Sequence, residues 1–236
     1  MSHREPVLLA WSSGKDSAWS LHVLKAREDI EVVGLLTTLN EAFDRVAMHA
    51  VRRELAEAQA RAVDLPLTTV MIPYPCPNEV YETALTEALV DARGKGIQGI
   101  AFGDLFLEDI RRYRERHIQG MGLSLHFPLW GRPTAALARE MIAGGLRARL
   151  TCVDPRVLPA SFAGREFDAQ LLEGLPSGVD PCGENGEFHT FAFDGPMFRY
   201  PVPVSLGEVV SRDGFVFADL LATVEPGPPR RREPSN

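Results

Sequence analysis

The sequence has few cysteines, no long apolar run and a deficit of positive charge. Its three cysteines, Cys76, Cys152 and Cys182, are odd in number and far apart, which argues against a disulfide framework and indicates a reducing compartment. No apolar run is long enough to span a bilayer, and the N-terminus lacks the apolar length and cleavage site of a signal peptide. We therefore expect a cytoplasmic protein without a membrane partner.

The charge balance is acidic. Against 32 Asp and Glu there are 25 Lys and Arg, so the formal net charge is -7, and the sequence pI is near 5.4. This balance argues against an extended nucleic-acid track and favours a small molecule or one particular protein as the partner. The 236 residues suffice for one large domain or for a full domain with a smaller one.

Apolar and amphipathic segments alternate along the first part of the chain. Apolar runs occupy residues 7–11, 32–39, 67–72, 97–102 and 125–130, and helical patterns occupy 18–26, 48–62, 79–93, 107–119 and 134–142. This alternation predicts a parallel sheet with right-handed crossovers, whose ligands lie beyond the carboxyl ends of the strands.

The composition changes near Pro155. A helical stretch at 165–172 is followed by Gly, Pro and strand-like segments at 188–193, 198–204 and 215–224, and Asp194-Gly195 signals a hairpin between the first two. The predicted units are a domain of residues 1–154, a smaller α+β domain of residues 155–224, and a disordered tail of residues 225–236. The late apolar strands form either a homodimer edge or a surface covered within the chain.

The turn after the first strand has the residue types of a phosphate-binding loop. Gly14 permits close approach of the backbone, and the helix that follows presents unpaired N–H groups to an anion. Lys15 adds charge, and Asp16 is suited to capping the helix or to holding Mg²⁺. Hydroxyl donors come from Ser12, Ser13 and Ser17. Such residues also cap ordinary helices, but the position after the first strand of an α/β alternation favours a phosphate site.

A second polar cluster extends from Asp180 to Thr190. Its functional groups belong to Glu184, Asn185, Glu187, His189 and Thr190. If Phe188 starts a strand, Glu187 and His189 share one face and can meet a substrate together. A Gly-rich turn with a solvated acidic pair is the ordinary alternative, and the spacing does not specify a closed zinc site.

The two motifs together resemble a known family. The loop Ser12-Ser13-Gly14-Lys15-Asp16-Ser17 resembles the PP-loop of the adenine nucleotide α-hydrolase-like superfamily, usually Ser-Gly-Gly-x-Asp-Ser, with Ser13 in the place of a Gly. The segment from Gly183 to Thr190 resembles the Gly-Glu-x-Gly-Glu-Tyr/Phe-His-Thr signature of the diphthine–ammonia ligase family. Further similarities are at Met48-His49, Gly103-Asp104, Pro128-Leu129-Trp130 and Asp194-Gly195-Pro196.

The resemblance implies an α/β protein in which a Rossmann-like, HUP-type PP-loop domain precedes a small α+β domain, with the active cleft between them. It implies a ligase that adenylates a carboxylate with ATP, releases pyrophosphate and lets ammonia displace AMP. The implied partners are ATP, Mg²⁺, ammonia and a carboxylate acceptor on a protein or a small molecule. The alternatives are another PP-loop ATP-pyrophosphatase, acting on tRNA or a nucleoside, and a non-catalytic adenine-nucleotide sensor.

The resemblance also implies roles for particular residues. The implied ATP-binding residues are Ser12, Ser13, Gly14, Lys15, Asp16, Ser17, His49, Gly103 and Asp104. The implied catalytic residues are Lys15, Asp16, Glu184, Glu187 and His189, with Asn185 and Thr190 binding the substrate and Asp16 holding Mg²⁺. At most one or two arginines of the stretch 111–117 are expected to reach this site, since a solvated helix face is the ordinary explanation for most of this stretch.

Overall fold

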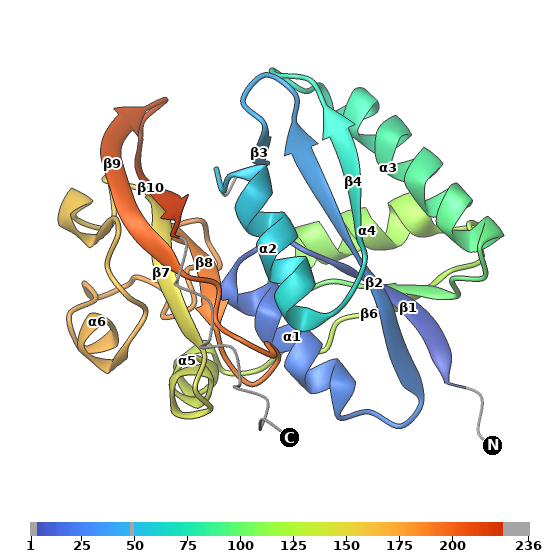
Figure 1. Cartoon of the computed structure of the whole chain (residues 1–236), viewed down its shortest axis with the longest axis horizontal. Coiled ribbons are helices and arrows are strands. Elements are labelled where there is room, and N and C mark those ends of the chain that lie inside the picture. The colour runs from blue at the N-terminus through green and yellow to red at the C-terminus, as the bar shows by residue number, and fades with distance from the viewer. Residues whose placement is uncertain (1–3, 48–49, 224–236) are drawn as a thin grey trace, which may run out of the picture.

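The structure is a computed structural model that describes residues 4–47 and 50–223, and in this part of the chain it contains two β-sheets (Figure 1). The strands of the first sheet are β1 (Glu5–Ala10), β2 (Ile30–Asn40), β3 (Arg45–Val46), β4 (Leu67–Ile72), β5 (Gly99–Ala101) and β6 (Ser124–His126). Those of the second are β7 (Arg147–Val153), β8 (Phe188–Asp194), β9 (Val204–Arg212) and β10 (Phe215–Ala222). The α-helices are α1 (Lys15–Lys25), α2 (Arg53–Val63), α3 (Asn78–Gly94), α4 (Glu108–Ile118), α5 (Thr134–Ala143) and α6 (Ala169–Glu173).

The first sheet is mostly parallel, which confirms the predicted α/β class. Its parallel strands run in the order β4-β2-β1-β5-β6, and the short β3 pairs antiparallel with β2. Val7, Leu8 and Leu9 of the central β1 are all buried, as expected of a strand covered on both faces. The chain adds β2 and β4 on one side of β1 and then crosses to add β5 and β6 on the other. Ligands of such sheets bind at this switch point, between the carboxyl ends of β1 and β5.

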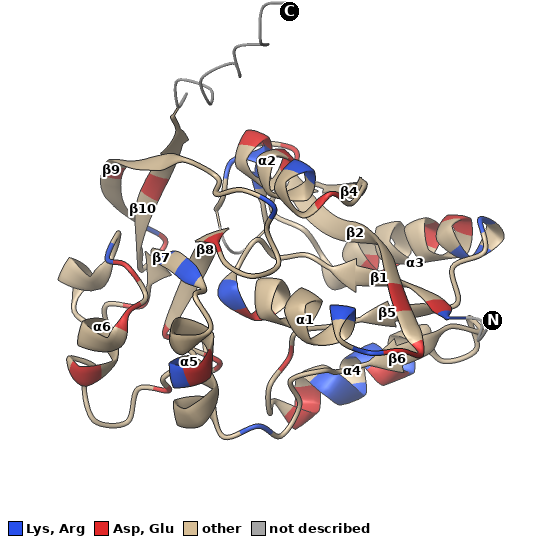
Figure 2. Ribbon diagram, turned by 60° about the horizontal axis from the view of Figure 1, so that its bottom comes forward, with Lys and Arg blue, Asp and Glu red and all other residues tan. Residues whose placement is uncertain are grey.

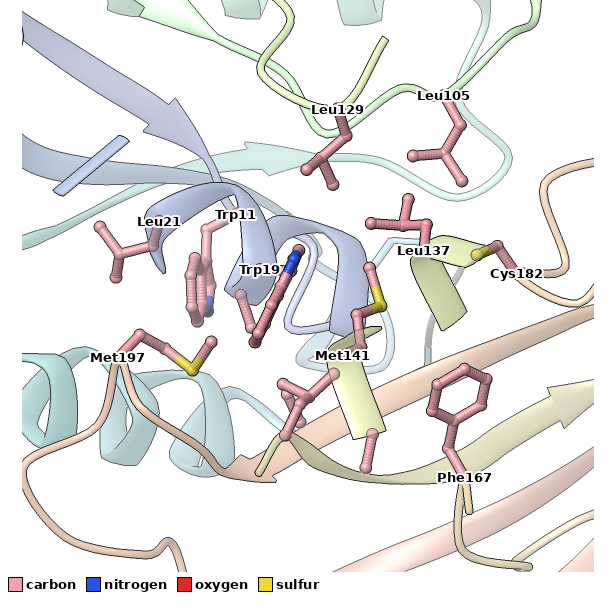
Figure 3. Close-up of a cluster of buried hydrophobic side chains, with 14 of the residues drawn as sticks. Trp11, Trp19, Leu21, Leu105, Leu129, Leu137, Met141, Phe167, Cys182 and Met197 are labelled. Carbon is pink, nitrogen blue, oxygen red and sulfur yellow. The ribbon is translucent and has the colours of Figure 1, made fainter. Parts of the chain in front are cut away.

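Helices cover both faces of this sheet. On one face, Leu89 of α3 and Ile118 of α4 pack in one apolar cluster with Ile100 of β5. On the other face lie α1 and α2, followed by the second sheet (Figure 1). A single apolar cluster joins Trp19 of α1 to Met141 of α5 and to side chains of the second sheet (Figure 3). The two sheets therefore share a packed core, which fixes the second sheet against α1.

The second sheet is antiparallel, with the strand order β8-β7-β10-β9. The predicted hairpin at Asp194-Gly195 is wrong, because β8 pairs with β7 and β9 pairs with β10. The turn between β9 and β10 is Asp213-Gly214, whose φ angles of 52° and 83° are both left-handed, as two-residue hairpins require. The segment 198–204 is also not a strand of its own, since β9 begins at Val204.

Two helix boundaries and one strand differ from the sequence prediction. The helix expected from residue 48 begins at Arg53, because Ala50 has a φ of 55° and Arg52 is extended and bridges to Arg45. The helix expected over 165–172 is the shorter α6, capped by the Asp168 side chain. The run 125–130 contributes only β6, which ends at His126.

The sequence analysis did not predict β7. Its inward residues Ala148 and Leu150 are buried, whereas Arg147 and Arg149 alternate with them and pair with Glu166. This strand belongs to the second sheet although it precedes Pro155, and the domain boundary stays a prediction.

Two of the predicted features fall on residues that the structure does not describe. His49 and the tail 225–236 lie outside the described residues. None of the helices in the described ranges is both long and apolar enough to cross a membrane. Three apolar side chains of β9 are exposed in the described part of the chain, namely Leu206, Val209 and Val210.

Candidate active site

A cavity of about 530 Å³ lies at the carboxyl ends of the first sheet, a volume in the usual range for small-ligand sites. Its walls come from the ends of β1 and β2, the first turn of α1, the turn after β5 and the beginning of α4. The remaining walls are the segment from the end of β4 into α3 and the segment 182–190, which leads into β8 of the second sheet. The two polar motifs of the sequence therefore line one cavity, at the switch point of the first sheet.

The loop of residues 12–17 is held by its own hydroxyl groups. The backbone N–H of Gly14 donates to Ser12 Oγ at 3.3 Å, Ser12 Oγ lies 3.2 Å from Ser17 Oγ, and Ser17 Oγ donates to the Gly14 carbonyl at 3.0 Å. Gly14 precedes α1 and offers no side-chain cap, but Thr190 Oγ1 of β8 accepts the backbone N–H of Lys15 at 3.0 Å. The second motif thus completes the N-terminus of α1.

Ser13 is buried and has a φ of 69°, in the left-handed region. Glycine adopts this conformation without strain, whereas another residue costs about 1–2 kcal/mol, which explains the Gly in the usual form of the loop. The Ser13 hydroxyl has no hydrogen-bond partner among the described residues. Neither Ser13 nor Gly14 lines the cavity, so the structure places both behind the loop rather than against a ligand.

Lys15 connects the two motifs. Its ammonium group donates to both carboxylate oxygens of Asp16, at 2.8 and 3.1 Å, and to the Cys182 carbonyl. It also lies 5.5 and 5.4 Å from the ring centroids of Phe167 and Phe188. Burial lowers the pKa of Lys15, but the charge and hydrogen bonds of Asp16, together with smaller contributions from Cys182 and Glu184, outweigh burial and hold this pKa above its usual value. Lys15 is therefore a permanent positive charge in the cavity wall.

The turn after β5 approaches the loop closely. A Cβ atom on Gly103 would lie 3.1 Å from the Asp16 carbonyl carbon, so glycine permits this contact. Asp104 follows and forms an ion pair with Arg114 of α4, whose Nη2 lies 3.0 Å from Asp104 Oδ1. The Arg114 guanidinium group also lies 4.1 Å from the ring centroid of Phe102.

Arg114 is the arginine of α4 that lines the cavity, which agrees with the expectation of one or two. Figure 2 shows Lys and Arg interleaved with Asp and Glu on α4. Arg111 and Arg112 form ion pairs with Glu115 and Glu108 of the same helix. Arg111 also lies over the rings of Phe127 and Trp130, at 5.0 and 4.8 Å from their centroids. Arg112 and Arg116, in contrast, are exposed and belong to a solvated helix face.

Glu184 lines the cavity, and its Oε1 accepts the backbone N–H of Leu105 at 2.7 Å. The pKa of Glu184 is raised to about 7, chiefly by burial and also by the charges of Asp16 and Asp104, against the opposing effect of the hydrogen bond from Leu105. A carboxyl group with such a pKa exchanges protons near neutral pH, which suits a general acid or base.

His189 also lines the cavity. Burial, together with repulsion by Lys15, lowers the pKa of His189 to about 4. The imidazole is therefore neutral at pH 7 and has one nitrogen that can accept a proton or a hydrogen bond.

The structure places Glu187 and Asn185 away from the cavity. The carboxylate of Glu187 accepts hydrogen bonds from the backbone N–H groups of Asp180 and Asn185 and from the Asn185 amide, all at 3.0 Å. Glu187 and His189 were expected to share one face and to meet a substrate together, but only His189 lines the cavity, because the Glu187 side chain turns into its own loop. Its contacts stabilise the loop that presents Glu184.

The apolar end of the cavity was not predicted from the sequence. Its residues include Leu36, Val46, Ala47, Ile72, Tyr81, Leu85 and Phe102. Ile72 ends β4 and Phe102 directly follows β5, where the carboxyl-edge rule would have found them. A planar, mostly apolar group such as a nucleobase fits this end, whereas phosphates fit the polar end at residues 12–17.

No group of three or more His, Cys, Asp or Glu among the described residues is arranged to hold a metal ion by itself. Magnesium in nucleotide sites needs only one or two carboxylates, because phosphates and water supply its other ligands. Asp16 lines the cavity with its side chain 26% exposed, so its carboxylate fits this requirement.

Comparisons with known proteins agree with both motifs. Residues 6–125 match the family Diphthamide synthase N-terminal domain, and residues 133–217 match the Diphthamide synthase C-terminal domain. The chain is 26% identical over 231 residues to the diphthine–ammonia ligases of Mus musculus and Homo sapiens, covering 89% of this chain and 86% of each relative. It is 34% identical over 130 residues to that of Danio rerio, covering 52% of this chain and 51% of the relative.

Proposed function

The chain belongs to the diphthamide synthase family, and we propose that it is an ATP-dependent ligase that joins ammonia to a carboxylate in an amide bond. The names of its relatives support a ligase of this kind. We further propose that the carboxylate is first adenylated, with release of pyrophosphate, and that ammonia then displaces AMP.

The observation that carries the proposal is that one cavity joins the phosphate-type loop of residues 12–17 to the proton-transfer groups Glu184 and His189. A protein that only senses a nucleotide needs the first of these and has no use for the second. A ligase needs both, because it must stabilise a leaving pyrophosphate and also remove a proton from the attacking nitrogen.

The polar end of the cavity is suited to the pyrophosphate. The first turn of α1 directs its N–H groups toward an anion, and Lys15 and the hydroxyl groups of Ser12 and Ser17 supplement it. Thr190 fixes the first turn of α1 and the Cys182 carbonyl holds the Lys15 ammonium group, so both are in position before a nucleotide binds. Asp16 would hold Mg²⁺, which neutralises phosphate charge when it is bound.

Glu184 and His189 face the remaining space, where the acceptor and ammonia would meet. Ammonia in neutral solution is mostly ammonium, so the site must take up a proton. Glu184, with a pKa of about 7, is our candidate base, and the neutral His189 is suited to accept a hydrogen bond from the nitrogen. Asp104, paired with Arg114, would orient the nucleotide.

The test is an analysis of ATP cleavage products with Mg²⁺, with and without ammonium, in the presence of separate protein and small-molecule fractions from the source cell. The proposal predicts AMP and pyrophosphate only when ammonium and one fraction are both present, and the active fraction identifies the class of acceptor. ADP and phosphate, or ATP binding without cleavage in every fraction, would contradict it.

A further inference from the structure

Gln59 of α2 lies at the junction of three elements, and its side chain is completely buried. Its Oε1 accepts the indole N–H of Trp11 at 2.8 Å. Its Nε2 donates to the Ser13 carbonyl at 3.0 Å and to the Ala192 carbonyl of β8 at 2.6 Å. Both hydrogens and the oxygen of the Gln59 amide therefore take part in hydrogen bonds. If the amide were turned by about 180°, its NH₂ group would face the Trp11 N–H and its oxygen would face the two carbonyl oxygens, so all three hydrogen bonds would be lost.

We infer that Gln59 is a positioning residue that sets the conformation of the phosphate loop from behind. This inference rests on the proposed function of the loop in binding ATP.

The Ser13 carbonyl is the group on which Gln59 acts. It accepts hydrogen bonds from Gln59 Nε2 and from the backbone N–H of Ala192, at 3.0 and 2.9 Å. Both donors lie away from the cavity, which Ser13 does not line. A carbonyl oxygen turned toward the cavity would repel a phosphate, so these two bonds keep the wall next to α1 free of negative partial charge.

The backbone of Ser13 makes this support necessary. Its φ of 69° is unfavourable for a residue with a side chain, and its hydroxyl has no partner among the described residues that would stabilise it. Without Gln59, the loop would relax toward a conformation with negative φ, and only a fraction of molecules would keep the binding-competent loop. The apparent affinity for ATP then falls to that fraction of its intrinsic value.

The test is a double-mutant cycle on equilibrium binding of MgATP, measured by calorimetry and needing no acceptor. Gln59→Met has nearly the same shape but makes none of the three hydrogen bonds, and we expect its affinity for ATP to fall by about 10- to 100-fold. Ser13→Gly in the Gln59→Met background should restore most of the affinity, because glycine adopts the positive φ without support. The effect of Ser13→Gly on the affinity should be much smaller in the wild-type background than in the Gln59→Met background, which is the signature of coupling between the two residues.

A merely structural role predicts a different result. If Gln59 only stabilised the fold, Gln59→Met would lower the melting temperature without lowering the affinity of the folded protein, and Ser13→Gly would have the same effect in both backgrounds. Either observation would overturn the inference. Leu89→Ala is the control, because it removes a buried side chain on the opposite face of the first sheet and should destabilise the fold without changing the affinity for ATP.

Two further outcomes are distinguishable. If Gln59→Met does not fold, Gln59→Asn retains an amide that is one methylene too short, and the same loss and rescue are expected of it. If the wild-type protein binds no ATP, the proposed function fails and the inference fails with it. If the wild type binds ATP and Gln59→Met binds it equally well, only the inference fails.

Discussion

Thr190 of β8 accepts a hydrogen bond from the backbone N–H of Lys15 at 3.0 Å, although 175 positions separate the two residues. The first turn of a helix leaves such N–H groups without partners inside the helix. Here the missing partner comes from the second sheet, so a residue of the second motif completes the loop of the first. The two motifs are therefore parts of one structure, and each depends on the other for its geometry.

The Thr190 contact predicts a difference between two substitutions at one position. Thr190→Val keeps the shape but leaves the buried N–H of Lys15 unpaired, which should lower the free energy of unfolding by about 1–3 kcal/mol. Thr190→Ser keeps the acceptor and should lose less. Urea unfolding measures both, and equal losses for Val and Ser would show that the methyl group of Thr190, and not its oxygen, stabilises the junction.

The close approach of Gly103 to the loop of residues 12–17 predicts a steric effect of a larger side chain at this position. A methyl group at Gly103→Ala would lie 3.1–3.2 Å from backbone atoms of Asp16 and Ser17 and would push the β5 turn away from α1. We expect a loss of stability of about 1–3 kcal/mol and weaker ATP binding, because this contact forms one wall of the cavity. Gly94→Ala is the matched control, since its methyl group would meet nothing within 4 Å. Unchanged ATP binding in Gly103→Ala would contradict the assignment of this turn.

The raised pKa of Glu184 predicts how the rate of amide formation changes with pH on the acidic side of the profile. Its pKa of about 7 lies above that of an ordinary Glu, so the protonated form, which accepts no proton, predominates below pH 7. At a fixed concentration of unprotonated ammonia, the rate of amide formation should rise as the pH increases through about 7 and then level off. Glu184→Gln should lose this limb together with most of the activity, by about 10²- to 10⁴-fold. A wild-type profile without a transition near pH 7 would remove Glu184 from the role of base.

Asp219 of β10 predicts an effect on the apolar end of the cavity. It forms ion pairs with Arg45 at 2.8 Å and Arg52 at 2.6 Å, which flank the segment containing the cavity residues Val46 and Ala47. Asp219→Asn should raise the KM for ATP more than it lowers kcat, and should lower the free energy of unfolding by about 1 kcal/mol. Asp91→Asn removes an exposed ion pair on α3 and should change neither constant. A change in kcat alone would contradict this account of Asp219.

The sequence predicted the residues that line the cavity better than the residues that hold them in place. The loop of residues 12–17 and the pair Gly103-Asp104 were found because the carboxyl ends of parallel strands meet at one edge of a sheet. Glu187 was misassigned because strand periodicity describes residues within a strand, and Glu187 lies just before β8. Gln59 was missed because a single Gln in an amphipathic helix has no local signal, and its role depends on Trp11 and Ala192, which are distant in the sequence.

The hairpin error has a similar origin. The sequence contains two Asp-Gly pairs, at 194–195 and 213–214, and local turn preference cannot decide between them. The pairing of β8 and β9 depends on β7. This strand is difficult to recognise in the sequence because arginines alternate with its buried apolar residues. Once β7 occupies the position beside β8, β9 is left to pair with β10.

The most direct test of the account counts nitrogen transferred per ATP cleaved. The protein is incubated with MgATP, ¹⁵N-ammonium and the acceptor fraction, and AMP, ADP and the ¹⁵N-amide are measured together for the wild type and for Asp16→Asn. We predict one ¹⁵N-amide for each AMP in the wild type and neither product from the folded Asp16→Asn variant. ADP as the product, AMP without nitrogen transfer, or full activity of Asp16→Asn would contradict the proposal that this loop drives amide formation.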